Sequence, residues 1–304
     1  MQFDNSWDAL MKPGQATTYF DLDPLPPWQL SATRYSPKTA WWLAELSRLI
    51  YRQEKDELGS KAAPPTRNEI LHRVGLEEVA FFNNGGMQGA VVRSQDTRRS
   101  FNVVVFRGTH DLRDWLTNLN TMPGPWKPGG KVHKGFKQGI DFVWADIVDT
   151  LDGLDGPTFY TGHSLGAALA TLAASLRPPR ALYTFGSPRV GNKAFAKTLD
   201  KVPVFRVVNN RDIVTTVPPD WPPFDYRHVG ELRYIAHNDR MLVNPSSQSV
   251  AMDRLRRDAS LARTTNAHRL FVDPPEPLAD HAPVNYVAHL ERLMAPSRSR
   301  RRHA

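Results

Sequence analysis

The chain has 304 residues, enough to enclose a sizeable hydrophobic core, and its 40% hydrophobic and 23% charged residues are ordinary for a globular protein. It has no cysteine, which excludes disulfides, thiolate metal sites and cysteine nucleophiles. Its formal net charge is +8, but the sequence has no helix-turn-helix, zinc-finger or aromatic-platform signature of a nucleic-acid-binding protein. It also has no run of about 18 apolar residues. We therefore expect neither a nucleic-acid partner nor a transmembrane segment.

Residues 1–35 are rich in proline and aromatic side chains, and we expect them to form an irregular N-terminal extension. The first 15 residues carry Asp4 and Asp8 and lack an apolar stretch, which is unlike a cleaved signal peptide. Together with the absence of cysteine, this predicts a protein of the cytoplasm, or one exported without a classical cleaved signal peptide.

Regular structure is predicted to begin at residue 36. Ser36 followed by Pro37 is typical of a helix start, and apolar residues then recur at helical spacing as far as Ile50. Thr66 and Glu69 form a capping-box pattern that opens a second helix. Two apolar stretches on either side of Asn83-Asn84-Gly85-Gly86 predict a β-hairpin.

From residue 101 onward, short apolar runs alternate with helical patterns. The runs are typical of parallel strands buried on both faces, and they lie at residues 103–106, around 159–160, at 181–185 and at 204–208. The helical patterns lie at 136–151, at 165–176 and near 192–199. This alternation predicts an α/β fold, a mainly parallel central sheet flanked by helices, in one domain spanning residues 36–295.

Two parts of the C-terminal region depart from this pattern. Residues 237–280 are polar and contain several prolines, which predicts an excursion from the domain with one helix near 249–262. We expect residues 296–304 to form a disordered basic tail, with attraction to anionic lipid surfaces as the alternative. The basic residues of this tail are Arg298, Arg300, Arg301 and Arg302.

The most informative motif is Gly162-His163-Ser164-Leu165-Gly166, which lies between an apolar strand and an alanine-rich helix. A serine presented on such a sharp turn needs small residues two positions away on either side, and Gly162 and Gly166 meet that need. The alternative is a plain strand-to-helix turn with a capping serine. The context favours Ser164 as a nucleophile and the α/β-hydrolase fold as the architecture.

A serine nucleophile needs a base and an acid to orient that base, and in this fold the chain order is serine, acid, histidine. The candidate acids after Ser164 include Asp200, Asp212, Asp220 and Asp225. Asp212 is the best placed, because it follows a predicted strand by a few residues and so lies at the same edge of the sheet as Ser164. Among the histidines, His281 lies in a loop before the last predicted helix, and His228 is a rival by position. The remaining candidates are His237, His268 and His289.

The transition state of acyl transfer also needs donors for its negative oxygen. One is the backbone N–H of Leu165, the residue after the nucleophile. The second is expected in a loop after an earlier strand, and the strand at 103–106 ends in Arg107-Gly108-Thr109. Because Gly108 allows a close backbone approach, Thr109 is the candidate second donor. The alternative for this segment is an ordinary turn at a strand end.

Taken together, these segments resemble the class 3 lipases, the fungal triacylglycerol-lipase type of α/β-hydrolase. The resemblance covers roughly residues 38–290. It rests on residues 106–109 with Asp114-Trp115, on 132–136, 161–170, 185–192 and 209–218, and on Asp280-His281 with Tyr286. It implies a triad of Ser164, Asp212 and His281, with Thr109 and Leu165 at the oxyanion hole, and it favours His281 over His228.

The resemblance also implies a lid over the site at residues 110–121. Its apolar stripe has helical spacing and consists of Leu112, Trp115, Leu116 and Leu119. A packed amphipathic helix is the alternative.

The sequence therefore predicts a serine carboxylic-ester hydrolase that acts on acylglycerols or related lipid esters through an acyl-enzyme. It predicts no metal or organic cofactor, a lipid or acyl-ester substrate as partner, and peripheral contact with lipid surfaces. The alternatives are a phospholipase A1, a thioesterase, or a non-catalytic lipid-binding protein that retains the fold.

Overall fold

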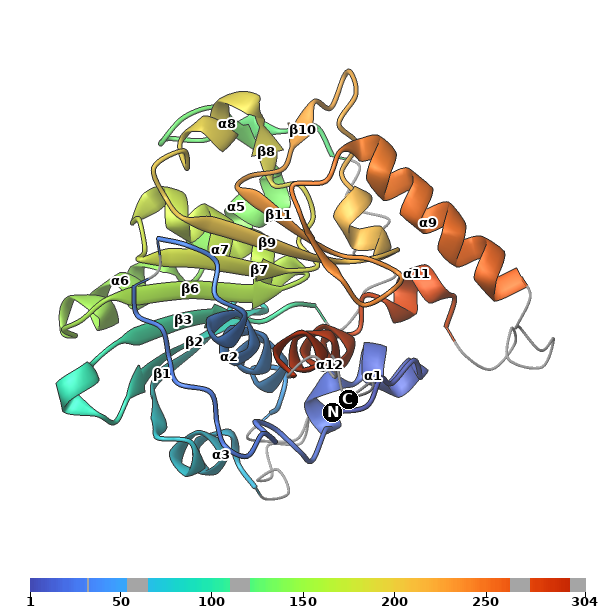
Figure 1. The fold of residues 1–304 in the computed structure, drawn as a ribbon. Coiled ribbons are helices and arrows are strands. Elements are labelled where there is room, and N and C mark those ends of the chain that lie inside the picture. The colour runs from blue at the N-terminus through green and yellow to red at the C-terminus, as the bar shows by residue number, and fades with distance from the viewer. Residues whose placement is uncertain (32, 54–64, 110–120, 263–273, 296–304) are drawn as a thin grey trace, which may run out of the picture.

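A computed structural model describes residues 1–31, 33–53, 65–109, 121–262 and 274–295 (Figure 1). Its centre is an eight-stranded sheet with the strand order β1-β2-β3-β6-β7-β9-β11-β12. The strands from β3 to β11 in this order are parallel to one another, and antiparallel strands pair at both edges. The strands are β1 Leu76–Asn84, β2 Met87–Ser94, β3 Asn102–Phe106, β6 Thr158–His163, β7 Ala181–Phe185, β9 Val204–Asn209, β11 Glu231–Ile235 and β12 Met241–Val243.

Helices cover both faces of this sheet. Val103 and Val105 of β3 belong to the core on one face, and Val104 and Phe106 belong to the core on the other, because successive strand side chains point in opposite directions. Helices α2 and α12 pack on the first face, and α5, α6 and α7 on the second (Figure 1). The predicted α/β fold with a mainly parallel sheet is confirmed. The helices are α2 Pro37–Leu49, α5 Lys134–Asp141, α6 Trp144–Asp152, α7 Leu165–Leu176 and α12 Pro283–Met294.

The sequence predicted one helix over residues 136–151, but the structure has two, α5 and α6. The chain bends at Val143, whose φ is −124° and whose N–H donates to the Ile140 carbonyl, three residues back, at 3.1 Å. The five apolar residues of the pattern are all buried, so their spacing did not reveal the bend. The predicted helix starts at Ser36 and Thr66 and the hairpin at 83–86 are confirmed.

The N-terminal residues contact the helices of the first face. Their regular elements within 1–31 and 33–35 are the helix α1 Trp7–Met11 and the 3-10 turn η1 Pro13–Gln15. The Phe20 N–H donates to Glu45 Oε1 at 2.9 Å, and the Trp42 indole N–H donates to the Pro26 carbonyl at 2.8 Å. These bonds fix the segment against α2.

In the 237–280 region, α9 spans Ser247–Ala262 and extends outward from the sheet (Figure 1). Asp253 anchors it, because its carboxylate accepts from Tyr234 Oη at 3.0 Å and from Asn210 Nδ2 at 2.7 Å. No helix among the described residues is long and apolar enough to cross a membrane. The smaller elements are α3 Arg67–Arg73, η2 Thr97–Arg99, β4 Gly124–Pro125, β5 Lys131–Val132, β8 Gly191–Asn192, α8 Lys193–Lys197, η3 Ile213–Thr216, β10 Tyr226–Arg227 and α11 Glu276–Ala279.

Candidate active site

Ser164 occupies the turn between β6 and α7 with φ 59° and ψ −127°, and only 2% of its surface is exposed. This backbone conformation is costly for any residue except glycine. The turn closes because both flanking positions lack side chains. A Cβ on Gly162 would lie 2.3 Å from the Gly166 carbonyl carbon, and one on Gly166 would lie 2.1 Å from the Phe106 oxygen. The expected strand-turn-helix context of Ser164 is confirmed.

Asp212 follows β9 and is fully buried. Its two carboxylate oxygens have separate partners. Oδ1 accepts from the Val214 N–H at 2.9 Å, whereas Oδ2 accepts from His281 Nδ1 at 2.8 Å and from the Tyr286 hydroxyl at 2.5 Å. Burial and the neighbouring Asp212 charge raise the pKa of Tyr286 well above 10, so the phenol stays protonated and donates to the carboxylate.

His281 lies in the loop between α11 and α12 and is 2% exposed. Its Nδ1 is held by Asp212, which leaves Nε2 as the atom that can accept a proton. Within the described part of the chain, His281 Nε2 and Ser164 Oγ are both buried without a hydrogen-bond partner. In the absence of substrate, the hydrogen bond between nucleophile and base is often not formed.

Ser164 lies beside this Asp–His pair. The Ser164 N–H donates to the Phe185 carbonyl at 3.0 Å. Gly186, which follows Phe185, lies close to both Asp212 and His281. A Cβ on Gly186 would lie 2.7 Å from Asp212 Oδ2 and 2.9 Å from His281 Nδ1, so glycine makes room for their hydrogen bond. The structure thus brings the predicted nucleophile, acid and base together, and it adds Tyr286 and Gly186 as neighbours to which the sequence assigned no role.

Of the two predicted oxyanion donors, Thr109 comes three residues after the end of β3, and Leu165 begins α7. Leu165 is the first residue of α7, where backbone N–H groups are free of helical partners. The Phe106 carbonyl and the Arg107 backbone pack directly against Gly166, in the first turn of α7. Thr109 is half-buried. The predicted lid residues Leu112, Trp115, Leu116 and Leu119 lie outside the described residues.

The rival histidines are engaged elsewhere. His228 is half-buried, and its Nε2 bonds to the Thr215 carbonyl at 2.8 Å. Burial and nearby arginines lower the pKa of His228 well below 6.5. His237 contacts Asp253 and His289 contacts Asp239, while His268 lies outside the described residues. The rival acids Asp220 and Asp225 pair with Arg189 and Arg227, and Asp200 is exposed.

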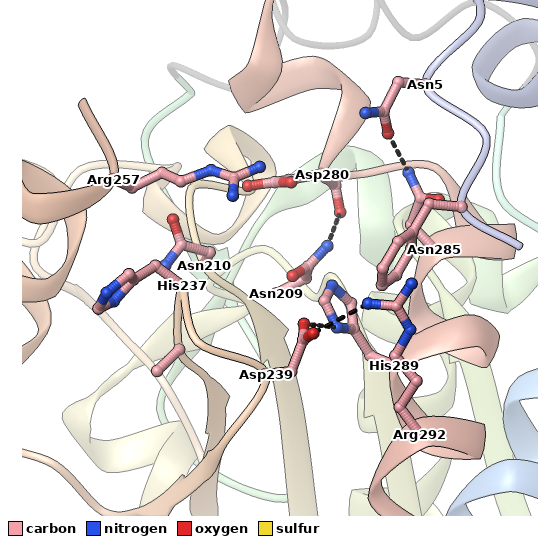
Figure 2. Close-up of a pocket in the computed structure, with 12 residues that line it drawn as sticks. Asn5, Asn209, Asn210, His237, Asp239, Arg257, Asp280, Asn285, His289 and Arg292 are labelled. Carbon is pink, nitrogen blue, oxygen red and sulfur yellow. Dashed lines mark hydrogen bonds and ion pairs between the residues drawn. The ribbon is translucent and has the colours of Figure 1, made fainter. Parts of the chain in front are cut away.

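A polar cavity of about 170 Å³ is lined by Asp280, the residue before His281, and by Asn209 at the end of β9 (Figure 2). Asn209 Nδ2 donates to the Asp280 carbonyl at 3.0 Å. On the opposite side, Arg292 and His289 both contact Asp239. Burial, partly offset by a hydrogen bond from the Arg211 N–H, raises the pKa of the Asp280 carboxyl from 3.8 to about 7.

We expect Asp280→Asn to stabilise the protein at pH 8 and to have no effect near pH 4. Folded Asp280 binds a proton between pH 4 and pH 7 that the unfolded chain does not bind, so the free energy of unfolding of the wild type falls as the pH rises through this range. The gain at pH 8 should be about 1–4 kcal/mol, since one pKa unit corresponds to about 1.4 kcal/mol. Urea unfolding at both pH values measures it, and parallel pH dependences of the two proteins would contradict it.

Within the described ranges, no group of three or more histidine, aspartate or glutamate side chains is arranged to hold a metal ion.

The chain is similar in sequence and in structure to known lipases. The sequence model of the family described as Lipase (class 3) matches residues 103–221. A lipase of Rhizomucor miehei is 38% identical over 167 residues, 49% of this chain and 45% of the relative. A secreted mono- and diacylglycerol lipase of Fusarium solani is 40% identical over 153 residues, 46% of this chain and 45% of the relative.

Among solved structures, a lipase from Rhizopus microsporus var. chinensis superimposes with a TM-score of 0.59 at 28% identity, covering 80% of this chain and 95% of that one. The fold is therefore that of the α/β-hydrolases. Within that fold the chain belongs to the class 3 lipase family, as its motifs indicated. The chain spans about half the length of the curated relatives it matches.

Proposed function

We propose that the chain is a serine carboxylic-ester hydrolase that acts on acylglycerols or related lipid esters. One observation carries the proposal: Asp212 holds Nδ1 of His281, while Nε2 of the same ring is buried without a partner beside the turn that presents Ser164. A histidine arranged in this way can take the hydroxyl proton of a serine as that serine attacks.

The reaction we propose is a two-step acyl transfer. Ser164 Oγ attacks the ester carbonyl while its proton passes to His281 Nε2, and the Leu165 and Thr109 donors stabilise the resulting oxyanion. Each such donor is worth about 2.7–4 kcal/mol of transition-state stabilisation. His281 then protonates the departing alcohol, leaving an acyl-enzyme. Water attacks that ester, gives its proton to His281, and releases the carboxylic acid as Ser164 regains its proton.

Lipid esters are the proposed substrates because the relatives from Rhizomucor miehei and Fusarium solani are named as lipases. Ile213, directly after Asp212, keeps 40% of its surface exposed, which supports contact with an apolar substrate or a lipid surface near the site. The Fusarium relative is named as secreted, which supports export over the cytoplasmic alternative. Fractionation of the native host cells tests the location.

Covalent labelling tests whether Ser164 is the nucleophile. The folded protein should react with a fluorophosphonate and carry one adduct at Ser164, identified by peptide mass spectrometry, because the reagent mimics the ester carbonyl. The Ser164→Ala variant is the control and should remain unlabelled while folding normally. An unlabelled wild type that is folded would support the non-catalytic alternative instead.

A substrate panel tests the ester class. Rates should be highest with emulsified long-chain acylglycerols and measurable with soluble short-chain esters. A preference of more than about tenfold for a phospholipid or for a thioester would assign the chain to phospholipase A1 or thioesterase activity instead, since tenfold corresponds to about 1.4 kcal/mol of transition-state binding.

A further inference from the structure

His163, the residue before Ser164, connects two loops that the proposed reaction depends on. It is 3% exposed, and its two ring nitrogens have different partners. Nε2 bonds to the backbone carbonyl of His281 at 2.7 Å, and Nδ1 bonds to the hydroxyl of Tyr51 at 3.1 Å. Tyr51 comes two residues after the end of α2, so the contact joins segments more than a hundred residues apart in sequence.

The chemistry of these partners fixes the position of every proton. A carbonyl oxygen only accepts, so His163 Nε2 must carry the hydrogen. Burial and the neighbouring His281 lower the pKa of His163 well below 6.5, so the ring is neutral and its Nδ1 only accepts. The Tyr51 hydroxyl must therefore donate to His163 Nδ1.

The Tyr51 oxygen also lies against the oxyanion loop, which we define as residues 107–109. Gly108 is in close contact with the tyrosine, because a Cβ at this position would lie 1.9 Å from Tyr51 Oη and 2.9 Å from the His163 carbonyl oxygen. Only glycine fits here, and the next residue is Thr109, a proposed oxyanion donor.

His163 also contacts the ring of His281 directly. The two ring centroids are 4.4 Å apart with an angle of 34° between the planes. His281 becomes positively charged each time it takes a proton from Ser164. A neutral neighbour at this distance does not oppose that charge, whereas a protonated one would.

We propose that Tyr51 and His163 are positioning residues that hold the oxyanion loop and the loop of His281 in fixed relation around Ser164. The chain runs from Gly108, which packs against the Tyr51 oxygen, through the hydrogen bond from the Tyr51 hydroxyl to His163 Nδ1, to the hydrogen bond from His163 Nε2–H to the His281 carbonyl. This inference rests on the proposed function, because it concerns the placement of the donor and the base in that reaction.

Three variants and a double variant test the proposal with a soluble short-chain ester. Tyr51→Phe removes only the hydroxyl, and His163→Leu removes both ring nitrogens. Each should lower kcat by about 10- to 100-fold and change KM by less than about twofold, since small displacements of reacting groups cost rate rather than binding. His163→Gln retains an amide N–H near the position of Nε2, and it should recover most of the activity that His163→Leu loses.

Ser47→Ala is the matched control. Ser47 lies in α2 and shares a buried hydrogen bond of 3.0 Å with Thr161 in β6, so it joins the same two elements without touching the chain of bonds. We expect its kcat to stay within about twofold of the wild type. All rates are normalised to the folded fraction measured by circular dichroism.

The double variant Tyr51→Phe/His163→Leu separates positioning from general packing. If both residues act through one chain, the double variant should be no slower than His163→Leu alone, whereas independent packing effects would multiply. A kcat of Tyr51→Phe within about twofold of the wild type, or multiplicative losses, would overturn the proposal. Phosphonate labelling of wild-type Ser164 in the same experiment tells this failure apart from a failure of the proposed function, which would leave the wild type itself unlabelled.

Discussion

Replacing Asp212 with asparagine should lower kcat by about 10⁴-fold without unfolding the protein, the size of effect expected when an orienting acid becomes an amide. The reason lies in the separate partners of the two oxygens. Oδ1 accepts from the Val214 N–H, so the amide oxygen of asparagine will take that place. The amide NH₂ then faces His281 Nδ1 in place of Oδ2. Because it donates to Nδ1, the ring proton moves to Nε2, where it blocks proton transfer from Ser164.

A second aspartate–histidine pair supplies the control for this experiment. Asp253 contacts His237 and accepts from Tyr234 and Asn210, away from Ser164. Asp253→Asn should cost about 1–3 kcal/mol of stability but keep kcat within about threefold of the wild type. Steady-state kinetics on both variants give the comparison. If Asp212→Asn retains more than about a tenth of the wild-type kcat, Asp212 is not the orienting acid.

The second large effect is expected at the base. His281→Ala should reduce kcat by at least about 10⁴-fold, because no other group in the described part of the chain is placed to take the Ser164 proton. Its Nε2 is buried, and within the described residues it has no hydrogen-bond partner. The pre-steady-state burst of a chromogenic alcohol measures acylation directly. This burst should be absent in the His281→Ala variant.

His228→Ala is the matched histidine variant. His228 bonds to the Thr215 carbonyl and makes no described bond to Ser164 or Asp212. Its loss should lower the free energy of unfolding by about 1–3 kcal/mol and leave the activity of the folded fraction close to that of the wild type. The reverse pattern, an active His281→Ala and an inactive His228→Ala, would move the role of base to His228.

The parts of the site that were predictable from the sequence are those with local signatures. The turn that presents Ser164 is contained in five consecutive residues, and the glycines at 162 and 166 indicate that it is tight. Asp212 was recognisable because it follows a buried strand. The choice of His281 over His228 needed the family resemblance, since sequence order alone does not say which of two loops returns to the edge of the sheet.

Other features depend on contacts that no local pattern encodes. The bond between Tyr51 and His163 joins residues 112 positions apart, and the bond from His163 to His281 spans 118. His163 stands inside the motif, yet its position is one that the motif leaves open. The room that Gly186 gives to Asp212 and His281 appears only when three separate segments meet. The bend at Val143 could not be predicted because the apolar residues of α5 and α6 are buried in the same core, so their spacing continues across the bend.

The backbone conformation of Ser164 creates a conflict between the stability of the protein and its proposed activity. Its positive φ costs a residue with a side chain on the order of 1–3 kcal/mol, and the two packed faces of the sheet must hold it there. Glycine would adopt the same conformation without that cost, but it has no oxygen to attack an ester. If Ser164 is the nucleophile that we propose, selection for stability alone would favour an inactive protein of the same fold, and selection for catalysis keeps serine at this turn.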